Sequence, residues 1–323
     1  MKNILVTFDL WKEGQEILEK ELGPLARISY LKTAADRSRA LKEANILFSW
    51  NTPQEIKEEE YPLLKTAEIM QLLSAGADHL PFSKLPETLK VVANAGAYAE
   101  PMAEHTLAMI LCLLKRLLIE HQKIQQGIFD QLNENRKLKG LTAGILGFGG
   151  IGRAVARMLR PFEVKIMAIN TSGRTSELVE FAGTLKDLDY VLQNSDIVVV
   201  SLPLSNKTRG LIGEKELGEM KDNAVLINVS RGEIIEEKAL FDHLKAHPKF
   251  MAGIDAWWIE PFRHGRFEMR YPFPALPNVV CSPHNSGVVE DSLVEATKIA
   301  VENMKRYLQG GELRGVINRE DYL

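Results

Sequence analysis

LTAGILGFGGIGRAVARML, residues 141–159, has the order of a buried strand, a glycine-rich turn and the first turns of a helix. Ile145 and Leu146 belong to a short apolar run with the length of a strand buried in a parallel sheet. After the turn, apolar residues recur at helical spacing from Ala154 to Leu159. The free N–H groups and the dipole at the start of such a helix attract anions, so this stretch predicts an anion site.

The turn carries three glycines, Gly147, Gly149 and Gly152, in the G-x-G-x-x-G spacing. In a dinucleotide site the first permits a tight turn, the second lets the backbone approach a pyrophosphate, and the third lets helix and strand pack closely. Glycine turns also serve packing alone, so the motif by itself leaves both interpretations open. A second apolar strand at 164–170 favours the dinucleotide, because it ends at Asn170, where a ribose-binding residue is expected.

Composition excludes several classes of protein. The chain has 323 residues, enough for two domains, and its 45% hydrophobic and 26% charged residues are typical of globular proteins. A net charge of -3 argues against nucleic acid or anionic membranes as partners. Cys112 and Cys281 are too few for a disulfide scaffold; we expect both to be buried thiols, which fits a reducing, cytoplasmic location.

We expect neither a signal peptide nor a membrane span. The N-terminus lacks a long apolar core with a small-residue cleavage site. The longest apolar run, 107–119, is interrupted by Lys115 and Arg116 and is too short to cross a bilayer. No metal site is expected.

Short apolar strands alternate with amphipathic segments along the chain, which predicts an α/β fold of two doubly wound parallel-sheet domains. A single long helix is expected at about 101–126, and a C-terminal helix at 290–309 is expected to pack on the first domain. The domains predicted are 1–98 plus 289–323, and 99–288. Strands are expected at 3–8, 26–31, 45–50, 68–74, 90–95, 164–170, 196–204, 224–230, 251–257 and 278–284.

Charged side chains stand where three of the later strands end. Arg231 follows one strand, Asp255 ends the next with Glu260 shortly after it, and His284 ends the third. Singly, each has a plain alternative: a surface charge, a turn carboxylate, or a core histidine. Because carboxyl ends of parallel strands share one edge of a sheet, these groups are expected to gather where the glycine turn also lies.

This set suits hydride transfer to a 2-keto acid. The planar fork of arginine pairs a carboxylate at two points. Histidine can donate a proton to the developing alkoxide, and a neighbouring glutamate stabilises the imidazolium that does so. In the reverse direction the neutral imidazole takes the hydroxyl proton.

The motifs resemble those of the D-isomer-specific 2-hydroxyacid dehydrogenases, the family of glyoxylate and hydroxypyruvate reductases and of D-lactate and D-3-phosphoglycerate dehydrogenases. The resemblance covers nearly the whole chain. The segments that carry it are GFGGIGRAVAR (147–157), SLPLSNKTRGLIG (201–213), LINVSRGEIIEEKAL (226–240), GIDAWWIEP (253–261) and LPNVVCSPHNSG (276–287).

The resemblance implies a flavodoxin-like substrate domain, a Rossmann cofactor domain, a small-molecule substrate and a homodimer built through the cofactor domains. It implies that Arg231 binds the substrate and polarises its carbonyl, that Glu260 supports His284, and that His284 is the acid/base. Substrate contacts are expected from Ala75, Gly76, Ala77, Arg231 and His284, with the carboxylate on backbone amides of the SAGADHL loop. Cofactor contacts are expected from Gly147, Phe148, Gly149, Gly150, Ile151, Gly152, Asn170, Thr171, Ser172, Arg174, Leu202, Pro203, Thr208, Val229, Ser230, Arg231, Asp255, His284, Ser286 and Gly287.

Three features depart from the family pattern. Asn170 stands where NAD-dependent members carry an acidic residue, and with Thr171, Ser172 and Arg174 it favours NADPH over NADH as cofactor. A basic insertion occupies 262–273. Trp257 and Trp258 are bulky and, with Trp50 and Tyr98, either narrow the pocket or serve packing.

Another class of function stays open. The family includes corepressors that keep the fold and the arginine, glutamate and histidine of the site, yet act chiefly by binding partners. The chain is then a dinucleotide-sensing binding protein with weak turnover. No partner-peptide groove is indicated, so the enzyme is favoured. An amino-acid dehydrogenase or NAD-linked hydrolase is more distant, because no second lysine or cysteine motif supports it.

Overall fold

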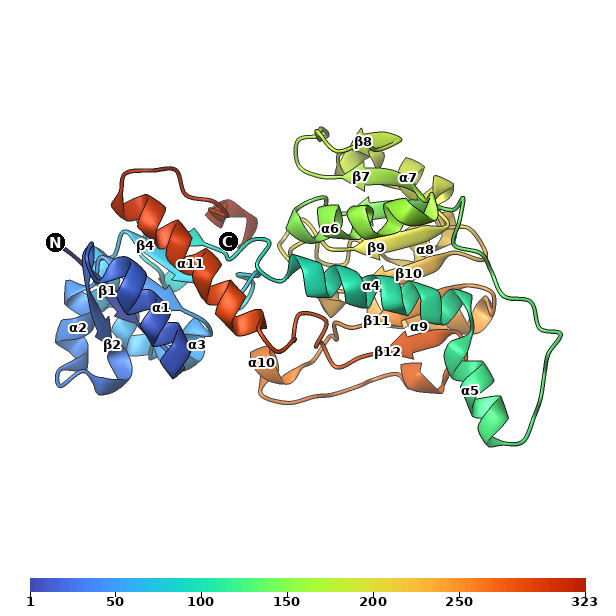
Figure 1. Ribbon diagram of the computed structural model, residues 1–323, viewed down its shortest axis with the longest axis horizontal. Helices are drawn as coiled ribbons and strands as arrows, with labels where there is room; N and C mark the ends of the chain where they lie inside the picture. Colours follow the sequence, from blue (N-terminus) through green and yellow to red (C-terminus); the bar gives the residue numbers. More distant parts are fainter. The chain divides into compact units, whose positions relative to one another are not determined.

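The computed structural model describes residues 1–323 and divides into two compact units (Figure 1). One comprises Met1–Tyr98 and Val289–Leu323, and the other comprises Ala99–Val288. Each holds one parallel sheet, so the predicted fold class is confirmed.

The first unit is built on a five-stranded sheet in the order β2-β1-β3-β4-β5, with every pair parallel. This is the flavodoxin-like strand order. Its strands are β1 (Lys2–Val6), β2 (Ala26–Tyr30), β3 (Ile46–Ser49), β4 (Ile69–Leu72) and β5 (Lys90–Val92).

The middle of this sheet is buried on both faces, which explains why β3 is a continuous buried run, ILFS. Ile4 and Val6 of β1 share a core cluster with α1 (Lys12–Leu22) and α11 (Ser292–Leu308). Leu5, between them, joins the cluster on the opposite face with α2 (Arg37–Glu43). The short α3 (Thr52–Glu55) follows β3.

The second unit has seven parallel strands in the order β12-β11-β10-β9-β6-β7-β8. The chain starts in the middle at β6, runs outward to β8, returns to β9 beside β6, and then runs outward the other way. This reversal is the Rossmann switch point, outside which dinucleotides bind. The strands are β6 (Thr142–Leu146), β7 (Lys165–Ile169), β8 (Phe181–Gly183), β9 (Ile197–Val200), β10 (Val225–Asn228), β11 (Met251–Ile254) and β12 (Val279–Cys281).

Helices cover both faces of this second sheet. α4 (Ala99–Leu114) packs against α6 (Gly150–Leu159) and crosses β10, β11 and β12. α8 (Glu214–Glu219) contacts both α7 (Leu188–Asn194) and α9 (Glu237–Ala246) on the opposite face (Figure 1).

The prediction of one long helix at 101–126 was wrong. α4 ends at Leu114 and α5 spans Leu117–Gln125, with Arg116 between them in the left-handed conformation at φ 54°. The segment that follows α5 supplies hydrogen-bond partners at the end of α4. Arg136 N–H donates to the Leu114 carbonyl at 3.0 Å, and Lys115 Nζ donates to the Arg136 carbonyl at 2.8 Å. A tertiary contact therefore stops a helix that local periodicity would continue.

The two cysteines are half-buried rather than buried. Burial nevertheless raises the pKa of the Cys281 thiol to about 12 and moves that of Cys112 in the same direction. Neither thiol is therefore a ready thiolate nucleophile. None of the helices has the length and apolar character that crossing a membrane requires.

The strands end at earlier residues than predicted. β11 ends at Ile254 and β12 at Cys281, so Asp255 and His284 lie in loops beyond the sheet edge. β8 and α7 were not predicted.

Candidate active site

The glycine turn follows β6 directly. Gly147 has φ 98°, and a Cβ there would lie 2.6 Å from the Ser201 backbone. A Cβ on Gly152 would lie 2.4 Å from the Gly147 carbonyl oxygen. Both positions therefore require glycine, the first to turn from β6 toward α6 close to the backbone after β9 and the second to let α6 pack against the turn.

Gly149 differs, because a Cβ there would meet no atom within 4 Å. It is exposed and precedes α6, whose first turn has no acidic residue and no side-chain cap. Gly150 is exposed, Ile151 is half-buried, and Phe148 beneath them is buried. The turn thus offers open space beside backbone N–H groups at a helix N-terminus, the surroundings that a phosphate needs.

Asn170, at the end of β7, organises the loop after it. Its amide nitrogen donates to the Arg174 carbonyl at 2.8 Å, and its amide oxygen accepts from Ser172 N–H at 3.0 Å. Thr171, Ser172 and Arg174 are exposed. The Ser172 hydroxyl bonds to Asn170 and to the Arg174 backbone within the loop, so the loop presents the Thr171 hydroxyl and the Arg174 guanidinium to solvent next to the glycine turn.

Thr208 shapes the loop after β9. Its hydroxyl donates to the Pro203 carbonyl at 2.6 Å and accepts from Ser205 N–H at 2.9 Å. Ser230, buried beside Val229, donates its hydroxyl to the Leu202 carbonyl and links the ends of β9 and β10.

Arg231 lies in a turn that Asn228 holds. The buried Asn228 side chain donates to the Arg231 carbonyl at 2.9 Å and accepts from Ser230 N–H at 3.1 Å. Arg231 is half-buried, and its Nη1 also donates to the Ser230 carbonyl at 2.8 Å. The guanidinium is therefore anchored to the end of β10.

His284 and Glu260 form a close pair. The His284 Nδ1 lies 2.6 Å from Glu260 Oε2, with the histidine side chain 28% exposed and the glutamate 6% exposed. A buried carboxylate at Nδ1 orients the ring and leaves Nε2 for other chemistry. His284 itself has φ 53°, the left-handed region that few non-glycine residues adopt.

Asp255 holds this unusual backbone in place. Its carboxylate is fully buried and accepts from Ser282 Oγ at 2.5 Å, Asn285 N–H at 3.1 Å and Ser286 N–H at 3.3 Å. The Asp255 carbonyl accepts from His284 N–H at 2.8 Å. Asp255 thus ties the loop on both sides of His284.

Strand register brings these groups to one edge. Asn228 of β10 pairs with Ile254 of β11, and Ile254 pairs with Cys281 of β12. Arg231, Asp255 and His284 follow these three neighbours, and the glycine turn follows β6 at the same edge. The structure therefore brings Arg231, Asp255 and His284 to the same sheet edge as the glycine turn, as predicted.

Other observations bear on a dinucleotide at this edge. The Ser286 hydroxyl is buried and has no hydrogen-bond partner within the protein. With the open space over Gly149, this leaves two places along the edge, after β6 and after β12, ready for polar ligand groups. Gly287 is half-buried beside Ser286. The residues present fit a dinucleotide.

The predicted substrate loop belongs to the first unit and follows β4. Ala75 is exposed, Gly76 is half-buried and Ala77 is buried. Ser74 Oγ donates to the Gly76 carbonyl at 2.9 Å, which fixes the loop locally.

The two tryptophans beside Glu260 serve packing. Trp257 is 6% exposed and donates Nε1–H to the Ser282 carbonyl at 2.8 Å. Trp258 donates to the Ile235 carbonyl at 2.7 Å and stacks on Phe273 with ring centroids 5.3 Å apart. Of the two interpretations of these rings, the structure favours packing.

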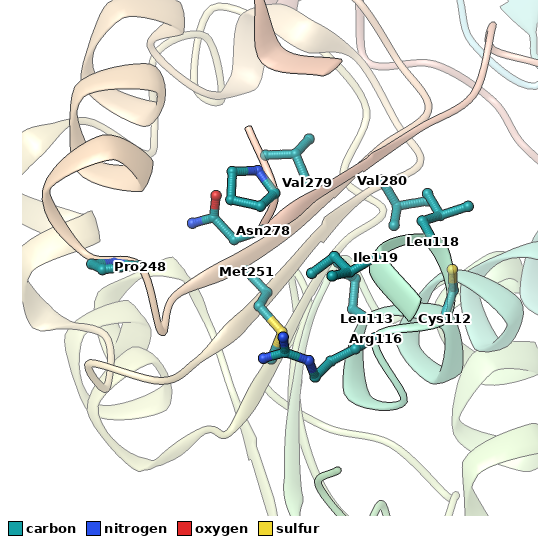
Figure 2. Close-up of a pocket in the computed structure, with 11 residues that line it drawn as sticks. Cys112, Leu113, Arg116, Leu118, Ile119, Pro248, Met251, Asn278, Val279 and Val280 are labelled. Atoms are coloured by element: carbon teal, nitrogen blue, oxygen red, sulfur yellow. The ribbon is translucent and has the colours of Figure 1, made fainter. Parts of the chain in front are cut away.

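A cavity of about 180 Å³ lies at the other edge of the same sheet (Figure 2). It is lined by the start of β11 at Met251, the start of β12 at Val279, and the end of α4 at Cys112 and Leu113. It contains none of the predicted site residues.

Sequence reasoning missed several residues that shape the site. Asn228 and Ser282 were not singled out, and His105 of α4, whose Nε2 lies 2.9 Å from Ser282 Oγ, was not either. A signal existed for Asn228, because asparagine two residues before a turn N–H is a common turn former. The contacts of Ser282 and His105 span distant segments and leave no local pattern.

Comparison with known proteins agrees with this architecture. Residues 107–286 match the family model described as "D-isomer specific 2-hydroxyacid dehydrogenase, NAD binding domain". The chain is 28% identical to a glyoxylate reductase from Aeropyrum pernix, over 98% of this chain and 96% of that protein. It is also 27% identical to a D-3-phosphoglycerate dehydrogenase from Archaeoglobus fulgidus. That match covers 79% of this chain and 48% of the longer relative.

A solved structure from Pyrobaculum aerophilum, provisionally described as a formate dehydrogenase, is also similar. It is 28% identical, covers 100% of both chains and superposes with a TM-score of 0.83. The family model spans more than half of the chain and includes the glycine turn and the three strand-end motifs. The chain therefore belongs to the D-isomer specific 2-hydroxyacid dehydrogenase family, whose nicotinamide-dependent oxidoreductase chemistry the strand-end residues predicted.

Proposed function

We propose that the protein reduces a small 2-keto acid of the glyoxylate or hydroxypyruvate type to the D-2-hydroxy acid, with NADPH as the favoured cofactor. The observation that carries the proposal is the His284–Glu260 pair, 2.6 Å apart, at the sheet edge that also bears Arg231 and the glycine turn. A carboxylate ligand, a proton donor and a cofactor turn are the parts that this reduction needs.

The cofactor would be held by the backbone of Gly147–Gly152, by the loop at Asn170 and by the Ser286 hydroxyl. When bound, it supplies the hydride. Asp255 acts through the loop it ties, keeping Ser286 and His284 in place.

The residues of the chain supply the remaining steps. The Arg231 guanidinium pairs with the substrate carboxylate and polarises the carbonyl. Backbone amides of Gly76 and Ala77, in the first unit, are the carboxylate contacts that the family resemblance implies. His284 gives the proton on Nε2 to the carbonyl oxygen as it becomes an alkoxide. Glu260, hydrogen-bonded at Nδ1, stabilises the imidazolium before transfer and keeps the ring aligned. Solvent then returns the proton to His284.

A panel of 2-keto acids with NADPH and with NADH tests this function. Steady oxidation of reduced cofactor by glyoxylate or hydroxypyruvate, with the D-hydroxy acid as product, is expected. Dinucleotide binding without turnover across the panel would overturn the proposal and favour a sensor of the corepressor type.

Cofactor choice depends on the loop after β7. An acidic residue at position 170 would repel a 2′-phosphate, whereas Asn170 is neutral and folds a loop that exposes Ser172 and Arg174. Arg174→Ala is expected to raise the KM for NADPH more than tenfold, since a hydrogen bond to a charged group contributes about 1.5–3 kcal/mol. The KM for NADH is expected to change little.

Lys165→Ala is the matched control, because Lys165 is an exposed cation at the opposite end of the same strand. It should leave both KM values unchanged. A wild-type enzyme that prefers NADH, or an Arg174→Ala variant that loses both cofactors equally, would contradict the phosphate assignment.

The predicted homodimer remains a proposal, and exposed apolar side chains between 117 and 132 support it. Phe129 is 78% exposed and Leu132 is 92% exposed, unusual for large apolar residues that cover nothing. Phe129→Asp combined with Leu132→Asp is expected to turn a dimer into a monomer in sedimentation velocity. Leu178→Asp, at a residue 80% exposed, is the control. A wild-type chain that sediments as a monomer would rule the dimer out.

A further inference from the structure

Two site segments that are apart in sequence pack directly on each other. The turn after Arg231 approaches the backbone of the acid segment so closely that a Cβ on Gly232 would lie 2.3 Å from the Trp257 carbonyl carbon. The Trp258 indole adds a hydrogen bond to the Ile235 carbonyl at 2.7 Å. The segments 231–235 and 257–264 therefore form one contact surface beside the reacting groups.

A half-hidden ion pair closes this contact. Arg263 Nη1 donates to Glu233 Oε2 at 2.9 Å, and Arg263 Nη2 lies 2.7 Å from Glu233 Oε1. The two side chains are only 12% and 15% exposed. Such a two-point pair fixes orientation as well as distance, and shielding from water makes it stronger than a surface pair.

Each partner sits within three residues of a proposed functional group. Glu233 lies in the short 3-10 turn Gly232–Ile234 that follows Arg231, and Arg263 lies in α10 (Pro261–His264), which Glu260 precedes. His264 N–H donates to the Glu260 carbonyl at 2.9 Å, so α10 is tied to the backbone of Glu260. Single helical turns are not stable alone, so tertiary contacts must set the positions of both.

We propose that Glu233 and Arg263 are positioning residues: their ion pair fixes the Arg231 turn relative to the Glu260 segment. The guanidinium that binds the substrate carboxylate and the carboxylate that aligns His284 are thereby held at one separation. This inference rests on the proposed function and gives one residue of the 262–273 insertion a defined role.

The test uses the whole protein and three variants: Glu233→Gln, Arg263→Met, and the two combined. Each single variant breaks the two-point pair and leaves the partner's charge in a half-hidden position, so it is expected to lower the Tm; in Arg263→Met, Glu233 still has Arg209 Nη1 at 3.9 Å. The double variant removes both charges, so its Tm should recover toward wild type. Because a misplacement of 1 Å can cost about 100-fold in rate, the double variant should still show at least a tenfold loss of kcat/KM.

The loss should appear as a raised KM for the keto acid, with the cofactor dissociation constant unchanged. Arg266→Met is the matched control: it removes the same charge from the same insertion, at a side chain 65% exposed and paired only with Glu268. It should behave as wild type. A double variant with recovered Tm and wild-type kcat/KM would show that the pair serves stability alone, and would overturn the proposal.

A measurement that needs no turnover distinguishes a failure of this inference from a failure of the proposed function. Amide hydrogen exchange in the double variant should rise in both 231–235 and 257–264, and remain unchanged in Arg266→Met. If wild type turns over no keto acid, the proposed function fails, while the exchange result still decides whether the Glu233–Arg263 ion pair positions the two segments. Unchanged exchange in both segments would overturn that positioning role even in an active enzyme.

Discussion

His284→Ala is expected to lower keto-acid turnover by about 100-fold or more, the usual scale for removing a general acid. The Glu260 carboxylate holds Nδ1 at 2.6 Å, so the proton that reaches the substrate leaves from Nε2. The cofactor should still bind, because the glycine turn, the Asn170 loop and the Ser286 hydroxyl that would hold it remain. Steady-state rates and a fluorescence titration with reduced cofactor measure the two effects separately.

The backbone at 284 calls for a second variant. Alanine is disfavoured at φ 53°, whereas asparagine tolerates the left-handed region, so His284→Asn distinguishes lost chemistry from a disturbed loop. Both variants should be equally slow. Glu260→Gln keeps the shape of its side chain and should lower turnover, since the imidazolium loses a charged partner. Wild-type turnover in His284→Asn would remove His284 from the mechanism.

Arg231→Lys is expected to raise the KM for the keto acid more than tenfold while cofactor affinity stays nearly intact. Lysine keeps the charge but cannot form the two parallel hydrogen bonds of a guanidinium to a carboxylate, a loss of about 1.5–3 kcal/mol. The measurement is KM for glyoxylate beside the dissociation constant for reduced cofactor. Arg266→Lys, at a side chain 65% exposed and paired with Glu268, is the control.

The opposite pattern would reassign the residue. If Arg231→Lys weakened cofactor and substrate to the same degree, the guanidinium would belong under the dinucleotide rather than at the substrate carboxylate.

The sheets were predictable because buried parallel strands are apolar on both faces and stand out as short continuous runs. The gathering of Arg231, Asp255 and His284 at one edge could be predicted from the same pattern, since the carboxyl ends of parallel strands lie at the same edge of a sheet. Family membership rested on the glycine turn and the motifs around these residues, and the comparisons confirmed it. The roles of individual residues stay predictions.

What escaped prediction depends on contacts between distant segments. The break at Arg116 is caused by Arg136, twenty residues on, which satisfies the last carbonyl of α4. The partnership of Glu233 with Arg263 joins two turns thirty residues apart. β8 is only three residues long, too short for periodicity to reveal. No local pattern encodes such contacts, because each partner alone looks like an ordinary surface charge or loop.

The left-handed backbone of His284 sets stability against activity. A non-glycine residue in this region costs about 1–3 kcal/mol, and here Asp255 and its neighbours hold it in place. His284→Gly would remove that cost, but it would also remove the proposed acid and leave the buried Glu260 carboxylate without its imidazole partner. The strain and the pair therefore belong to one arrangement, in which the position of the histidine side chain is obtained at the expense of its backbone. Efforts to stabilise this enzyme should accordingly leave the loop at 282–286 untouched and seek their gains elsewhere in the chain.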